Sequence, residues 1–290
     1  MGNYFYGCTS LVDFEPHKNL KSVALDALEG SGWENAQPDG ALAFGRICYG
    51  YKGDITNLVI PEGVSIVEAY AFLGCEQIKT VTFGPDVEEI GLYAFQNCVN
   101  LETMTCDTAV SIIRAGAFKG CSSLKEADFS ECTISTIGYE SFSGCTSLTS
   151  VTLSNSLEKI SEGLFAECSA LTDIVIPDSV TEIEKGAFLN CVALHTAIVG
   201  RGVTAIGEDA FSNCATLQSI TIGESVTGKR AFHKCDCILG MICKPQTPPV
   251  VEYLVLPETA TIYVPQKMTR TYKKDMSWSD YAKQIKRIKE

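Results

Sequence analysis

A triplet of residues recurs along most of this chain at nearly constant spacing. Phenylalanine is followed after three residues by cysteine, and after three more by leucine or isoleucine, and the triplet returns every 21 to 24 residues. The phenylalanines are Phe72, Phe95, Phe118, Phe142, Phe165, Phe188, Phe211 and Phe232, and an N-terminal copy begins at Phe5. Self-similarity of this length predicts a solenoid, because each repeat can bury its apolar edge only against its neighbours.

One repeat indicates how a coil is built. Leu171, Ile174 and Ile176 have the spacing of the strand residues in leucine-rich repeats, and Val180–Ile183 forms a second short extended piece. The segment Glu184–Cys191 is long enough for about two helical turns. We therefore expect an α/β repeat solenoid with a parallel sheet, in which equivalent strands of successive coils lie about 4.8 Å apart.

The recurring cysteine has four possible roles: a disulfide framework, a metal array, a row of reactive thiols, or packing. Nine of the 14 cysteines occupy this position. A disulfide needs converging Cβ atoms about 3.5–4.5 Å apart, whereas equivalent positions in stacked coils hold parallel side chains about 4.8 Å apart. A single row also cannot supply tetrahedral metal ligands. We predict a buried, reduced cysteine ladder that packs as small apolar side chains.

The cysteines outside the ladder suggest little further chemistry. Cys106 replaces a strand aliphatic and is expected in the core. His233, Cys235, Cys237 and Cys243 are close in sequence, but their spacing matches no zinc pattern. A disulfide between Cys237 and Cys243 is the alternative at that point. No metal and no cofactor is expected.

Three modules are predicted. Residues 1–57 hold truncated first repeats with a hairpin insertion at Trp33–Asp54, where Asp39-Gly40 is a turn signal. Residues 58–240 form the solenoid of about 23-residue units. Residues 241–290 form a strand-helix cap, in which 272–288 has apolar residues at helical spacing. The charge differs between modules: residues 58–238 contain 10 Lys and Arg against 23 Asp and Glu, and residues 239–290 contain 9 against 5.

The unit L-x-x-I-x-I-P-x-S-V-x-x-I-x-x-x-A-F-x-x-C resembles the BspA-like, or Treponema-type, leucine-rich repeat over residues 1 to about 240. Trp33–Asp54 is similar to a hairpin insertion of that family, and Ala260–Glu290 to its closing segment. The resemblance implies a right-handed leucine-rich-repeat superhelix and a secreted or cell-surface protein of anaerobic bacteria or protists that acts in adhesion and protein binding. The chain begins within a unit and without a leader, so we expect either a fragment of a longer protein or a truncated or leaderless gene.

Several function classes are disfavoured. A net charge of −12 argues against nucleic acid as a partner, and no apolar run approaches the ~18 residues that span a bilayer. Coil alignment brings Asp173 and His195 to adjacent strands, with Ser150 and Ser219 nearby. A hydrolytic triad also needs an oxyanion pocket, which a smooth sheet does not provide. We expect a protein that is not an enzyme.

The strand face is the candidate contact surface. The third and fifth residues of each strand unit should face solvent, because strand side chains alternate. These residues are Thr80, Thr82, Thr103, Thr105, Glu126, Asp128, Ser150, Thr152, Asp173, Val175, Thr196 and Ile198, and we call them the strip. Ser219 and Thr221 continue the pattern. Threonine also has a high strand propensity, so a purely structural role of the sheet explains much of the composition of the strip.

The function expected from the sequence is protein–protein interaction or adhesion at the cell surface or in secreted form. Three carboxylates in the strip, Glu126, Asp128 and Asp173, favour a protein partner with a basic surface, such as a host or matrix protein. The strip has no aromatic residue, which weakens stacking of carbohydrate on this face. The alternative is a structural spacer within a larger cell-surface protein.

Overall fold

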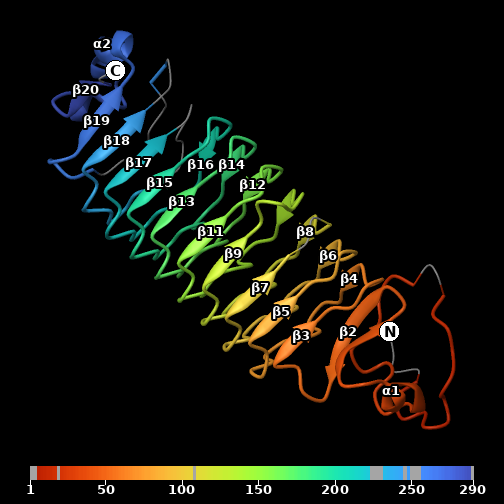
Figure 1. Ribbon diagram of the computed structural model, residues 1–290. Helices are drawn as coiled ribbons and strands as arrows, with labels where there is room; N and C mark the ends of the chain where they lie inside the picture. The colour runs from red at the N-terminus through yellow and green to blue at the C-terminus, as the bar shows by residue number, and fades with distance from the viewer. Residues whose placement is uncertain are drawn as a thin grey trace.

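The computed structural model describes residues 5–17, 20–106, 109–222, 231–243, 247–248 and 256–288. It is an elongated solenoid whose short strands follow one another from the N-terminal hairpin to the C-terminal cap (Figure 1). Most coils place one strand in each of two parallel sheets, and the core lies between the sheets. Among the described residues, no helix is both long and apolar enough to cross a membrane.

The first sheet contains the longer strand of each coil. Its strands are β3 (Asn57–Val59), β5 (Thr80–Thr82), β7 (Thr103–Thr105), β9 (Glu126–Asp128), β11 (Ser150–Thr152), β13 (Asp173–Val175), β15 (Thr196–Ile198), β17 (Ser219–Ile222), β18 (Gly240–Cys243), β19 (Thr261–Val264) and β20 (Ile285–Arg287). Pairing is continuous within β3-β5-β7, β9-β11 and β13 to β20. Asp173 pairs with Thr196, and Thr196 with Ser219, so the register follows the 23-residue interval of the sequence.

The second sheet begins at the hairpin. Its strands are β1 (Gly40–Phe44), β2 (Ile47–Lys52), β4 (Ile66–Val67), β6 (Glu89–Ile90), β8 (Ile112–Ile113), β10 (Thr136–Ile137), β12 (Lys159–Ile160), β14 (Glu182–Ile183) and β16 (Ala205–Ile206). β1 and β2 are antiparallel, and β2 then pairs in parallel with β4. The predicted hairpin insertion and the second extended piece of each repeat are thereby confirmed.

The turns between β14 and β15 contain no helix, so the prediction of two helical turns over Glu184–Cys191 is wrong. The backbone enters the left-handed region at Gly186, with φ 60°, and at Asn190, with φ 63°. Its N–H groups point to the next coil: Gly186 donates to Glu208 at 2.9 Å, and Phe188 to Ala210 at 2.7 Å. An α-helix needs those donors for its own carbonyls. Coil stacking uses them instead.

One left-handed position recurs in every described turn of this type, two residues before the phenylalanine. It is occupied by Tyr70, Tyr93, Gly116, Glu140, Gly163, Gly186 and Asp209, all with φ between 54° and 64° except Tyr93 at 52°. Glycine adopts this conformation without cost, whereas a residue with a side chain pays roughly 1–2 kcal/mol. Three repeats use glycine at this position, and two consecutive repeats use tyrosine.

The core is organised around a column of phenylalanine rings. Phe72, Phe95, Phe118, Phe142, Phe165, Phe188, Phe211 and Phe232 are all buried. Each ring stacks on the next at centroid distances from 4.9 Å to 5.8 Å, with interplanar angles of 5° to 18°. Identical residues in identical coils can pack only in this repeating manner, so the column continues along the solenoid as long as the repeat does.

The cysteine position is explained by a hydrogen bond between coils. The Cys121 Sγ–H donates to the Phe95 carbonyl of the preceding coil at 3.1 Å, and the same carbonyl accepts the backbone N–H of Cys98 at 3.2 Å. The thiol therefore satisfies a second acceptor site on a buried carbonyl. The same thiol contact is made by Cys98, Cys145, Cys168, Cys191, Cys214 and Cys235.

All 14 cysteines are free thiols in this structure, and the eight of the repeat from Cys75 to Cys235 are buried. Cys8 departs from the prediction and is exposed. Its copy is hydrogen-bonded to the following segment, with Phe5 N–H donating to Ala27 at 3.2 Å, but Phe5 is itself 41% exposed. The N-terminal copy thus stacks through its backbone without reaching the core.

The remaining cysteines differ in burial. Cys106 is half-buried and packs against the core, and its hydrogen bond to Cys132 raises its pKa. Cys237 is exposed while Cys235 and Cys243 are buried. The cysteines around His233 therefore point to different sides of the chain, and Cys237 and Cys243 are not joined by a disulfide in this structure.

The two ends are closed by different elements. α1 (Gly32–Ala36) precedes the hairpin, and the Ser31 hydroxyl caps it by accepting the Glu34 N–H at 3.1 Å. At the C-terminus, η1 (Gln266–Met268), α2 (Thr269–Lys274) and η2 (Ser279–Tyr281) lead into β20. Tyr272 and Trp278 are buried against each other, with ring centroids 5.4 Å apart.

The helix predicted over 272–288 is wrong beyond Lys274. The Asp275 side chain accepts the Ser277 N–H at 2.9 Å, a local turn that competes with helix continuation. Ile285 then joins the first sheet opposite Ile262. The apolar spacing that suggested one helical face comes from a strand and a one-turn helix that bury their side chains separately.

We expect the thiols to react with an alkylating agent according to their burial. In the native protein, iodoacetamide should modify the exposed Cys8 and Cys237 rapidly, while the eight buried thiols of the repeat react only after denaturation. Peptide mass spectrometry of native and urea-treated samples measures this. Rapid native labelling of all fourteen thiols contradicts the buried ladder.

Stability should fall at alkaline pH. Burial raises the pKa of Cys145 and of Cys191 from 9.0 to about 12. Below pH 9 these thiols stay protonated in both the folded and the unfolded protein. Above pH 9 the thiols of the unfolded chain lose their protons, whereas the buried thiols of the folded protein keep them. Each such thiol then lowers the free energy of unfolding by about 1.4 kcal/mol per pH unit until the folded thiol ionises.

Urea unfolding at pH 8, 9 and 10 measures the effect. The Cys145→Ala/Cys191→Ala protein should lose stability less steeply with pH than the native protein, whatever its starting stability. Equal slopes for the two proteins count against the explanation.

Candidate interaction surface

The strip lies on the outer face of the first sheet, as expected. On β13, Asp173 and Val175 are exposed while Ile174 between them is buried. The residues of the strip are paired across neighbouring strands, for example Glu126 with Ser150 and Asp128 with Thr152. Ten of its twelve members are exposed, and Thr80 and Thr196 are half-buried. The structure therefore places all twelve side chains on one continuous face.

The C-terminal half of this face becomes more apolar. Val175 is 59% exposed and Ile198 43% exposed, and the column continues through Thr221, which pairs with Ile242, to Tyr263 opposite Ile242. Ile242, Tyr263, Lys286, Arg287 and Ile288 line a groove of about 680 Å³ at the end of the sheet. A partner on the strip would meet hydroxyls first, then carboxylates, then aliphatic side chains.

The carboxylates of the strip carry charge that the described residues do not neutralise. No ion pair of the described residues includes Glu126, Asp128 or Asp173. Lys125 is the nearest basic residue in sequence, but its ammonium pairs with Glu102 at 2.6 Å. The Asp128 side chain accepts the N–H of Ser130 at 2.9 Å, and this bond leaves its charge in place.

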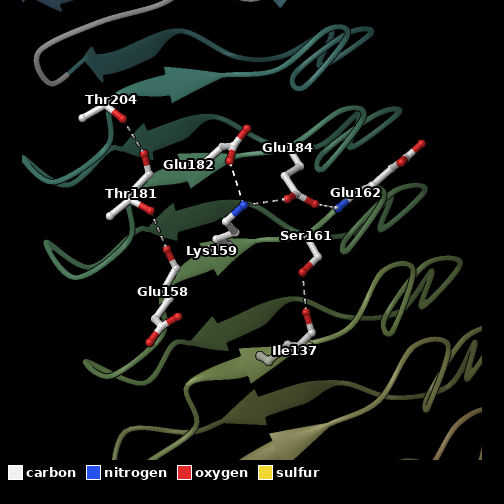
Figure 2. A network of polar contacts seen from close by, with 9 residues as sticks. All are labelled: Ile137, Glu158, Lys159, Ser161, Glu162, Thr181, Glu182, Glu184 and Thr204. Atoms are coloured by element: carbon white, nitrogen blue, oxygen red, sulfur yellow. Dashed lines mark hydrogen bonds and ion pairs between the residues drawn. The ribbon is translucent and has the colours of Figure 1, made fainter.

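The second sheet shows the opposite arrangement. Figure 2 shows Lys159 between two carboxylates of the next coil, at 2.9 Å from Glu182 and 3.3 Å from Glu184. Hydrogen bonds to these two groups raise the pKa of Lys159. Glu184 also accepts the Glu162 N–H at 3.0 Å. The charges of Lys159, Glu182 and Glu184 are thus paired between neighbouring coils.

Hydroxyls of the second sheet are also used between coils. Thr181 donates to the Glu158 carbonyl at 3.2 Å, and Thr204 donates to the Thr181 carbonyl at 3.1 Å (Figure 2). Ser161 reaches the Ile137 carbonyl in the same way. Polar side chains next to these strands therefore hold coils together. The first sheet also has such a contact, from Thr80 to Asn57 at 3.0 Å, so the difference between the sheets lies in the carboxylates of the strip, which belong to no ion pair of the described residues.

The residues considered for catalysis lie on open surface. Asp173 and His195 are both exposed, and the His195 backbone N–H donates to Thr172 at 2.7 Å, so the two residues do stand on adjacent coils. Ser150 is exposed on β11 and Ser219 is half-buried on β17. Three of these four side chains are exposed and the fourth is half-buried, so the described residues do not enclose them.

A row of tyrosines on the turn edge was missed by the sequence reasoning. Tyr70 and Tyr93 are the two tyrosines at the left-handed position, and their rings stack with centroids 5.6 Å apart. A hydrogen bond to the Tyr139 hydroxyl raises the pKa of Tyr93. The sequence does contain a signal for this row, because tyrosine occurs at the same repeat position in two consecutive units, at Tyr70 and Tyr93. We call Tyr70, Tyr93 and Tyr139 the tyrosine row.

Comparison with solved structures gives similar solenoids. A leucine-rich cell surface protein of Faecalibacterium prausnitzii is 22% identical, with a TM-score of 0.59, and the match covers 80% of this chain and 74% of that one. A leucine-rich repeat protein of T. pallidum is 26% identical over 66% of this chain and 82% of its own, with a TM-score of 0.49. A leucine-rich repeat protein from Bacteroides ovatus is 22% identical over 82% and 76%, with a TM-score of 0.47.

Comparison with curated proteins gives no match. The F. prausnitzii structure supports the solenoid fold. Its sequence identity of 22% is too low to carry over anything beyond the fold. A sequence model of the BspA type leucine-rich repeat region matches six copies, over residues 43–135 and 129–239. Because these matches cover well over half of the chain and coincide with the phenylalanine and cysteine columns, this protein belongs to the BspA-type leucine-rich repeat family.

Proposed function

We propose that this protein is a non-catalytic protein-interaction module and that the strip is its contact surface for a partner with a basic face. The family and the solenoid fold support the general role, because repeat solenoids offer extended surfaces made of rigidly stacked units. The proposed location is the cell surface or outside the cell. The family resemblance implies this location, and one structural neighbour is titled a cell surface protein.

The observation that carries the proposal is the contrast between the two sheets. Lys159 neutralises carboxylates on the second sheet, while Glu126, Asp128 and Asp173 remain without ion pairs among the described residues of the first sheet. Exposed carboxylates of one sign attract a basic partner during encounter and fix its register. Val175 and Ile198 supply exposed apolar area next to the charges, which an interface needs for its core.

The partner contact is tested by reversing charge on the strip. We expect the Glu126→Lys/Asp128→Lys protein to bind a basic partner about tenfold more weakly or worse, mainly through a lower association rate, because attraction becomes repulsion. The measurement is surface binding kinetics against purified extracellular-matrix proteins graded by net charge, at two salt concentrations. Binding of the native protein should weaken at the higher salt concentration.

The matched control is Glu162→Lys/Glu167→Lys, which makes the same change in net charge at two exposed turn residues outside the strip. This variant should retain most of the native association rate. Equal losses in both variants would show that net charge alone drives binding. If the native protein binds none of the basic proteins and the strip variant behaves identically, the module is a structural spacer.

A further inference from the structure

We propose that the tyrosine row is a second binding site, separate from the strip, and that it takes a neutral polysaccharide. The row lies on the turn edge that follows the second-sheet strands β4, β6 and β10, whereas the strip lies on the first sheet. Tyr70 is 40% exposed and Tyr139 51% exposed. Tyr93 joins them through the ring stack on one side and the hydroxyl hydrogen bond on the other.

Packing does not explain why these positions hold tyrosine. Tyr70 and Tyr93 have φ of 61° and 52° at a position that three repeats fill with glycine, and they are the only bulky aromatic residues there among the described repeats, the others being Glu140 and Asp209. A bulky residue with positive φ is a true outlier. The Tyr70 and Tyr93 rings are not part of the phenylalanine column, and Tyr70 is 40% exposed. Residues with a strained backbone conformation are concentrated at functional sites. Because the strain at Tyr70 and Tyr93 brings no ring into the core, contact with a ligand is the role that fits them.

Neighbouring positions make room for the row. A Cβ atom on Gly116 would lie 2.1 Å from two carbons of the Tyr93 ring, so that ring occupies the space in which a side chain would stand. The absence of a side chain at 116 lets Tyr93 cross its coil and reach Tyr139, which is two repeats further along. The three rings thus form one surface that spans four coils.

The chemistry of this edge suits a sugar chain. Tyrosine offers an aromatic face on which the C–H groups of a pyranose pack, and a hydroxyl that both donates and accepts hydrogen bonds. The polar groups beside the row are the exposed Asn97 and the Lys119–Glu140 pair at 2.6 Å. The protein's net charge of −12 disfavours an anionic polysaccharide. The Lys119–Glu140 pair beside the row has no net charge, so it does not attract a charged polysaccharide of either sign.

A protein partner is less well matched to the row. A stable protein interface needs about 800 Å² from each side with an apolar centre, and three rings flanked by amide and charged groups do not provide it. An extended polysaccharide needs only a narrow track, which the regular coil spacing supplies.

The test is native affinity electrophoresis through gels that contain a soluble β-glucan, an α-mannan or a xylan. We expect at least one polymer to retard the native protein. The Tyr70→Gly/Tyr93→Gly/Tyr139→Ser protein should lose that retardation, with an affinity at least about tenfold lower. Its urea unfolding midpoint should not fall, because glycine relieves the left-handed backbone at two positions. Tyr263→Ser, which removes a tyrosine from the first sheet, should be retarded like the native protein.

Three results overturn the proposal: no retardation of the native protein in any of the three gels, equal retardation of the triple variant, or loss of retardation by Tyr263→Ser alone. A lowered unfolding midpoint in the triple variant would instead assign the tyrosines to stability. If a purified protein partner binds the native chain and not the triple variant while no polysaccharide does, the row is a protein contact. The strip variants test a different face, so failure of either proposal is distinguishable from failure of the other.

Discussion

Besides backbone hydrogen bonds, successive coils of this protein share one contact between phenylalanine rings and one hydrogen bond from a thiol to a carbonyl. The phenylalanine column sets how coils are oriented, and the cysteine of each coil satisfies the phenylalanine carbonyl of the coil before it. A residue of another size or polarity at either position would leave a gap or an unsatisfied buried group. The 23-residue interval, the parallel register and the alignment of surface positions all depend on these two contacts.

Alignment has different consequences on the two sheets. Equivalent side chains of neighbouring coils lie close together, so like groups accumulate in columns. On the second sheet, Lys159 pairs with Glu182 and Glu184 of the next coil. On the first sheet, Glu126, Asp128 and Asp173 project outward, and none of them belongs to an ion pair of the described residues. One face therefore serves cohesion, and the other presents charge to the surroundings.

The parts that the sequence predicts well are those in which every repeat carries the same information. Phe188, Cys191 and the strand residues Ile174 and Ile176 are in the core as expected, because burial at these positions is required in each coil. The helix expected over Glu184–Cys191 fails for a reason that hydrophobic spacing does not reveal. The turn donates its N–H groups to the next coil, and that preference is visible only when two coils are placed together.

Features that occur once or twice were harder to predict. Residues 272–288 had helical spacing, but a side-chain turn at Asp275 and strand pairing at Ile285 divide the segment. The tyrosine row was overlooked because two of its members, Tyr70 and Tyr93, occupy a position that other repeats fill with glycine, glutamate or aspartate, and positive φ values are invisible to apolar periodicity. The strip, in contrast, followed directly from strand alternation at twelve positions.

The thiol contact also gives the solenoid a direction. Each cysteine reaches back by one coil, so the first coil of the series has a thiol without a preceding phenylalanine carbonyl. Cys75 holds that place, and its partner is the Tyr51 hydroxyl, supplied by the hairpin. The hairpin thus substitutes for a missing repeat and is needed only once, whereas an internal unit brings one thiol and one carbonyl together. Duplication of an internal unit would keep donors and acceptors in balance, so the length of such a molecule can change during evolution without a new type of junction.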